Sequence, residues 1–105
     1  MKLLTKEIAK KLPKLGATDG TDGVVVAKFF TPDANWTWYV TEGEPRGNGD
    51  WELFGLVDGH ELELGHFLLS EVEELRGPLG LPVERDAWWS EKKVSEVKKE
   101  NAEVW

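Results

Sequence analysis

Two histidines and three carboxylates lie close together in the middle of the chain and form its densest set of potential metal ligands: Asp58, His60, Glu61, Glu63 and His66. Imidazole and carboxylate groups can hold zinc or manganese, and the bound ion can activate a water molecule for hydrolysis. In an extended strand, however, His60 and His66 are about 20 Å apart at a rise of about 3.3 Å per residue. They can bind one ion only if the strand bends sharply, for example at Gly65. We therefore expect a solvated hairpin here and no metal site.

No other pattern in the sequence indicates catalysis. The chain has no cysteine, which excludes disulfides, thiol catalysis and cysteine-bound metal clusters. It has no nucleophile elbow and no dinucleotide-binding glycine pattern. The segment GEPRGNG (43–49) has the glycines of a phosphate-binding loop, but it lacks that loop's lysine and following helix. We expect a protein that is not an enzyme and that uses no cofactor.

Trp36 and Trp38 are the first candidates for binding through aromatic side chains. Alternate residues of a strand share a face, and two neighbouring indoles could stack nucleic acid bases. Such sites combine aromatic rings with a basic groove, whereas Lys28 is the one cation expected nearby. The alternative places both indoles, with Trp51, in the core. A tryptophan that stays exposed would instead anchor a protein partner.

Two arginines flank the segment GPLGLPV (77–83), in a part of the chain that is poor in positive charge. The guanidinium groups of Arg76 and Arg85 could grip a carboxylate or phosphate of a ligand. The alternative is local, with the arginines neutralising nearby acids such as Asp86 or binding carbonyl groups at a helix end. The candidate binding residues are therefore Trp36, Trp38, Arg76, Arg85 and Asp86.

Charge is distributed unevenly along the chain, which has a formal net charge of −7. Residues 1–15 carry five lysines and one glutamate, residues 16–91 sixteen acids and four bases, and residues 92–105 four lysines and three glutamates. The acidic body repels nucleic acid and suits a basic protein partner. The same charge could also serve only to keep the domain soluble.

The N-terminal segment MKLLTKEIAKKL is interrupted by charged residues and resembles no secretory signal. No apolar run approaches the roughly 20 residues that a membrane helix needs. We expect a cytoplasmic protein without membrane association.

The periodicity of apolar residues predicts a helix over 6–12, with Thr5 as its N-cap and Pro13 at its end. Four β-rich segments follow, at 24–30, 35–42, 51–58 and 60–68. Two further helices are predicted over 71–76, with Ser70 and Glu73 as a capping box, and over 91–101, with Ser90 as N-cap. The residues expected to contribute to the core include Val26, Phe30, Phe54, Leu62, Leu64 and Leu81.

This order of elements predicts an α+β fold. We expect a four-stranded antiparallel meander sheet, covered on one face by short helices and followed by a charged C-terminal helix. The length allows one domain, which we assign to residues 1–89, with residues 90–105 as a charged helical tail.

Four runs resemble a bacterial family known as domain of unknown function 2958: MKLLTKE (1–7), KFFTPDANWTWY (28–39), LFGLVDG (53–59) and LRGPLGLPVERD (75–86). The resemblance covers about residues 1–89, and the lysine-rich tail departs from it. It implies a small accessory protein of plasmids and integrative elements, with a role that includes interference with host defences. It supplies no catalytic residues.

The leading hypothesis is a non-enzymatic protein-binding module of a mobile genetic element. In one specific form, its carboxylates imitate a DNA backbone and inhibit a basic defence protein. The alternative is a nucleic-acid-binding protein that uses the lysine-rich termini and tryptophan stacking.

Overall fold

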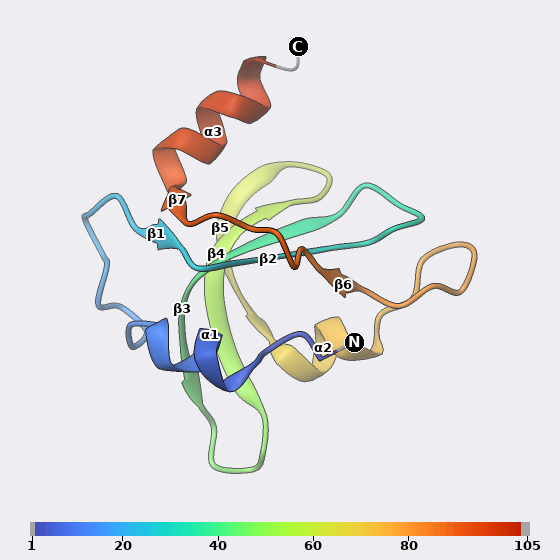
Figure 1. Ribbon diagram of the computed structural model, residues 1–105, viewed down its shortest axis with the longest axis horizontal. Coiled ribbons are helices and arrows are strands. Elements are labelled where there is room, and N and C mark those ends of the chain that lie inside the picture. The colour runs from blue at the N-terminus through green and yellow to red at the C-terminus, as the bar shows by residue number, and fades with distance from the viewer. Residues whose placement is uncertain (1, 104–105) are drawn as a thin grey trace.

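The fold is organised around a five-stranded antiparallel sheet with the strand order β5-β4-β3-β2-β6 (Figure 1). It is seen in a computed structural model that describes residues 2–103. The strands of this sheet are β2 (Ala27–Phe30), β3 (Thr37–Pro45), β4 (Trp51–Asp58), β5 (Leu62–Leu68) and β6 (Glu84–Arg85). A separate two-stranded sheet pairs β1 (Val24–Val25) with β7 (Lys92–Lys93). The helices are α1 (Lys6–Lys11), α2 (Leu69–Glu74) and α3 (Val94–Glu103).

The predicted α+β class and the antiparallel meander from β2 to β5 are confirmed. The predicted strand over 24–30 is divided at Val26, so that β1 pairs with β7 while β2 pairs with β3 and β6. The strands β6 and β7 have two residues each and were not predicted. Their sequences, Glu-Arg and Lys-Lys, carry no apolar alternation, and these strands form only because a neighbouring strand is brought beside them.

Apolar side chains cover both faces of the large sheet. In β3, Trp38 and Val40 point into one core cluster and Tyr39 into the other, because successive residues of a strand face opposite ways. The first cluster is closed by the N-terminal segment, α1 and α2, and the second by Val97 of α3. Figure 1 shows α3 at the top of the view and α1 and α2 in its lower half. The short helices α1 and α2 pack on one face, as expected, and α3, expected only as a charged tail, packs on the other.

The assignment of inward positions was also wrong. None of the six residues expected to contribute to the core is fully buried: Val26, Phe30 and Phe54 are half-buried, and Leu62, Leu64 and Leu81 are 39%, 50% and 43% exposed. In β2 the buried side chains are those of Ala27 and Phe29. Phe29 and Phe30 put an apolar ring on each face of β2, so alternation alone does not identify the more deeply buried face of this strand.

The N-termini of the three helices are held in different ways. Thr5 accepts a hydrogen bond from the Ile8 amide at 3.2 Å, which confirms the predicted N-cap of α1. The predicted capping box of α2 is wrong, because the helix begins at Leu69 and the Ser70 hydroxyl donates to Asp50 at 2.6 Å. Ser90 lies outside α3, whose first turn is held instead by the distant carboxylate of Asp22. Aspartates far away in sequence thus replace two of the predicted local caps.

Candidate functional site

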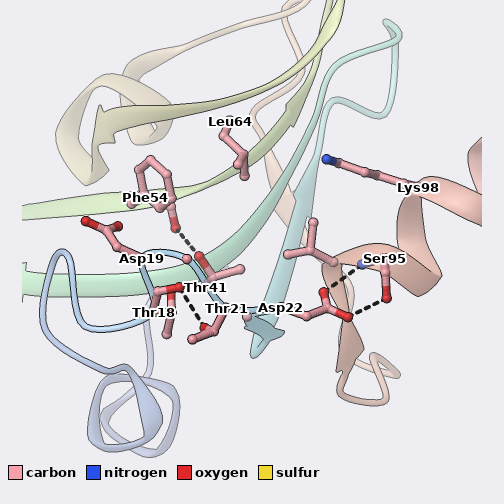
Figure 2. A pocket seen from close by; sticks show the side chains of 12 residues that line it. Thr18, Asp19, Thr21, Asp22, Thr41, Phe54, Leu64, Ser95 and Lys98 are labelled. Atoms are coloured by element: carbon pink, nitrogen blue, oxygen red, sulfur yellow. Dashed lines mark hydrogen bonds between the residues drawn. The ribbon is translucent and has the colours of Figure 1, made fainter.

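A hollow of about 370 Å³ lies between the loop 18–23, the sheet and α3 (Figure 2). Phe54 and Leu64 project into it from the neighbouring strands β4 and β5, and Lys98 extends toward these strands from α3.

Glu42 holds the chain beside this hollow in place. Its side chain is only 1% exposed, and it follows an irregularity in the register of β3 and β4. The carboxylate accepts hydrogen bonds from the amides of Gly16, at 2.7 Å, and Thr18, at 2.9 Å, and from the Thr18 hydroxyl. Burial by itself raises the pKa of Glu42, but these hydrogen bonds outweigh burial and lower the pKa below its ordinary value. Glu42 is therefore an ionised structural group and not a proton donor.

Asp22 connects the same loop to α3. Its carboxylate accepts hydrogen bonds from the Ser95 hydroxyl and from the Ser95 amide, the latter at 3.0 Å (Figure 2). The Ser95 hydroxyl, followed by the Ser95 amide, lowers the pKa of Asp22. The position is favourable, because a carboxylate stabilises the positive end of a helix dipole.

The lining of the hollow is suited to binding an apolar group. Phe54, Leu64 and Val94 supply apolar surface, while Asp19 and Lys98 supply charge. Thr18 and Asp22 are already engaged in structural hydrogen bonds. Within residues 2–103 no group of three or more histidines, cysteines or acids is arranged to hold a metal ion.

The two histidines considered as metal ligands have different neighbours. His66 Nδ1 lies 3.1 Å from Glu52 Oε2, and its ring packs at 4.7 Å from that of Phe54. His60 meets the ring of Trp36 edge-on, with the ring centroids 5.4 Å apart.

Trp36 and Trp38 are packed against each other, with ring centroids 6.1 Å apart. Trp38 is 5% exposed and belongs to the first core cluster, against which the half-buried Trp36 packs. A Cβ at Gly59 would lie only 2.3 Å from the Trp36 ring, so this indole rests directly on the backbone of the β4–β5 turn. This packing leaves little of the two indoles for stacking nucleic acid bases.

Arg76 and Arg85 each donate to backbone carbonyl groups of this chain. Arg76 donates to the carbonyl groups of Glu73 and Leu75, both at 2.9 Å, at the end of α2. Arg85 donates to the carbonyl group of Lys2 and so holds the N-terminal segment against β6. The contacts of Arg76 agree with the local interpretation of the sequence.

Asp86 shapes the turn that carries Trp88 and Trp89. Its carboxylate accepts from the Trp88 amide at 3.0 Å, and its own amide donates to the Lys28 carbonyl at 2.9 Å. The Trp89 indole turns inward and donates to the Val25 carbonyl at 2.9 Å. Trp88, in contrast, is 93% exposed and borders a shallow hollow of about 410 Å³ with Phe30 and Lys28.

Trp88 is the prominent surface residue that was not among the candidate binding residues. The local sequence carries no signal for its exposure, because Trp88 lies in a turn. Which of the two adjacent indoles is buried depends on the distant Val25 carbonyl, to which Trp89 donates.

The lysine-rich ends of the chain pack on opposite faces of the sheet. Ile8, Ala9 and Leu12 of the N-terminal segment pack against the first core cluster, and Val94 and Val97 of α3 belong to the second. Lys11 Nζ forms an ion pair with Glu91 Oε2, directly before β7, at 3.0 Å. Across the described part of the chain, no helix is long and apolar enough to span a membrane.

The chain belongs to the family described as "Protein of unknown function (DUF2958)", whose model matches residues 3–103. The family expected from the four sequence runs is thereby confirmed. The match continues through α3, so the expectation that the tail departs from the family is wrong. No match was found among curated proteins or among solved structures.

Proposed function

We propose that this protein is a non-enzymatic module that binds another protein, with Trp88 as its anchor. The observation that carries the proposal is the 93% exposure of the Trp88 side chain on a turn held by Asp86. Tryptophan is enriched among the residues that dominate binding energies at protein interfaces. A turn that is already ordered also loses little conformational entropy when a partner binds.

The family resemblance and the charge extend this proposal. The resemblance suggests an accessory protein of a mobile genetic element, acting in the cytoplasm. With sixteen acids and four bases over residues 16–91, the body of the protein suits a basic partner. A specific form of the proposal is an inhibitor of a DNA-binding defence protein, whose basic groove would receive these carboxylates in place of DNA.

The test is a comparison of the full-length protein with Trp88→Ala. Partners are captured from the native host, identified by cross-linking and mass spectrometry, and measured again with purified components. Loss of a central anchor costs about 2 kcal/mol or more, which corresponds to a dissociation constant at least about 30-fold higher. Leu79→Ala is the matched control, because Leu79 is 79% exposed and lies in another loop. Equal affinity of the parent protein and Trp88→Ala for every purified partner would refute the proposal.

A further inference from the structure

We propose that the free edge of β5 accepts an extended, basic segment of a protein partner as a sixth strand of the sheet. This surface is separate from Trp88, which lies beside Phe30 of β2 and Arg85 of β6, toward the other edge. The inference therefore goes beyond the proposed function, and either one can fail without the other.

The backbone of β5 provides the hydrogen-bonding groups for such an addition. β5 is the last strand of the sheet, with β4 as its one neighbour in the strand order. About half of the amide and carbonyl groups of an edge strand point away from its neighbour. Among these outward groups within residues 2–103, the Leu68 amide has a partner, the Glu71 carboxylate at 3.1 Å. For the rest of β5, no backbone hydrogen bond to a loop or turn is found in the described part of the chain.

β5 carries one acidic residue, Glu63, but it has no lysine, proline or bulge and is not very short, which are other common ways of protecting an edge strand. It has seven residues, with the sequence LELGHFL, and pairs with β4 in continuous register. A Cβ built at Gly65 would meet nothing within 4 Å, so the sheet face is uncovered at the middle of this strand. The opposite edge is formed by β6, which has only two residues.

Two leucines show where the side chains of the added strand would pack. Leu62 and Leu64 are 39% and 50% exposed. Leu64 also lines the hollow in which Phe54 and Val94 supply further apolar surface (Figure 2). Residues opposite each other on paired strands make side-chain contacts, so an apolar residue of the incoming strand would cover these leucines.

Charge identifies the chemistry of the incoming segment. Residues 51–75, which include β4, β5 and α2, contain seven acids and no lysine or arginine. Glu61 and Glu63 are both exposed at this edge. A second copy of the chain would bring the same acids and a further charge of −7, which disfavours pairing of β5 with itself. A segment of alternating apolar and basic residues would form hydrogen bonds with the β5 backbone and would also complement its acidic charge. Main-chain hydrogen bonding of a peptide to a sheet edge is a recurring mode of recognition.

The test uses the full-length, isotope-labelled protein and a synthetic seven-residue peptide of alternating valine and lysine. We expect NMR shift changes and slowed amide exchange confined to β5 and its surroundings, with binding that weakens as salt rises. The double variant Glu61→Lys, Glu63→Lys should weaken binding at least tenfold. The matched control is Glu73→Lys, Glu74→Lys, because these exposed acids lie on α2 outside the strand.

A second peptide separates strand addition from docking of side chains alone. N-methylation at alternate residues removes the amide donors of one peptide edge and leaves its side chains in place. Two such peptides, methylated on opposite edges, should differ at least tenfold in affinity if backbone pairing occurs. Equal binding of the two peptides, shift changes around Trp88, or a dimer of the chain that forms through β5 without peptide would each overturn the proposal.

Discussion

The carboxylate of Asp33 accepts hydrogen bonds from the backbone amides of Leu79, at 2.8 Å, and Leu81, at 3.4 Å. These contacts join the β2–β3 turn to the connection between α2 and β6, across 46 residues of sequence between Asp33 and Leu79. The two long runs that carry the family resemblance, 28–39 and 75–86, meet at this point. Leu79 is nevertheless 79% exposed, so the contact orders a surface loop and leaves its tip in solvent.

The close packing of Gly77 against Asp33 predicts the effect of adding a methyl group at Gly77. A Cβ at Gly77 would lie 1.7 Å from Asp33 Oδ1, so Gly77→Ala must displace the carboxylate from the loop. We expect the free energy of unfolding to fall by about 1–3 kcal/mol, measured by urea denaturation. Gly65→Ala is the control, since nothing lies within 4 Å of its Cβ, and it should leave stability nearly unchanged. Equal stabilities of the two variants would contradict the close packing at Asp33.

Glu42 should make the stability of the protein depend on pH. Its folded pKa lies below the ordinary value of 4.5, so its contribution is complete above about pH 4.5 and is lost as the pH falls through the folded pKa. Glu42→Gln should lower the free energy of unfolding at pH 7 by about 1–3 kcal/mol, because hydrogen bonds to a buried charge are lost. The difference from the parent protein should shrink below pH 4.5.

The measurement is urea denaturation from pH 7 to pH 2.5, with Glu61→Gln as control because Glu61 is exposed. This control should follow the parent protein throughout. If the stability of Glu42→Gln also follows that of the parent protein, the hydrogen bonds from Gly16 and Thr18 to Glu42 contribute nothing to stability.

Core substitutions should distinguish the buried from the exposed strand positions. Phe29 is 0% exposed, and Phe29→Ala should cost about 3–5 kcal/mol in thermal or chemical denaturation. Leu62→Ala and Leu64→Ala should each cost about 1 kcal/mol or less, because these side chains are 39% and 50% exposed. A loss at Leu64 equal to that at Phe29 would mean that a partner or a second chain buries β5 in solution.

The packing of the lysine-rich ends on opposite faces predicts weak binding of nucleic acid. We expect no sub-micromolar affinity for generic single- or double-stranded oligonucleotides near 0.15 M salt, measured by fluorescence anisotropy. Removing the tail would also remove Val97, which is 2% exposed in the core, so charge reversal is the cleaner test. If tight binding is found and Lys98→Glu, Lys99→Glu abolishes it, the nucleic-acid alternative is correct. The same reversal at Lys6 and Lys10 tests the other end of the chain.

Local patterns in the sequence were sufficient to predict those helices and strands whose signals lie within their own residues. Alternating and β-branched residues predicted the meander that contains β3 and β4, and Thr5 followed by a stop at Pro13 predicted α1. Four sequence runs were sufficient to identify the family. One of the alternatives that the sequence left open for Arg76, binding to carbonyl groups at a helix end, agrees with its contacts after α2.

Tertiary structure decided what depends on residues far apart in sequence. The first turns of α3 and α2 interact with Asp22 and Asp50, because folding brings distant loops to the helix ends. These aspartates replace the predicted caps, which were Ser90 and the Ser70–Glu73 box. Alternation defined two apolar faces for β2, but packing buried Phe29 more deeply than Phe30. Neither the 93% exposure of Trp88 nor the free edge of β5 follows from local preference. Both depend on which surfaces the rest of the chain covers, and this is decided only when segments distant in sequence have packed together.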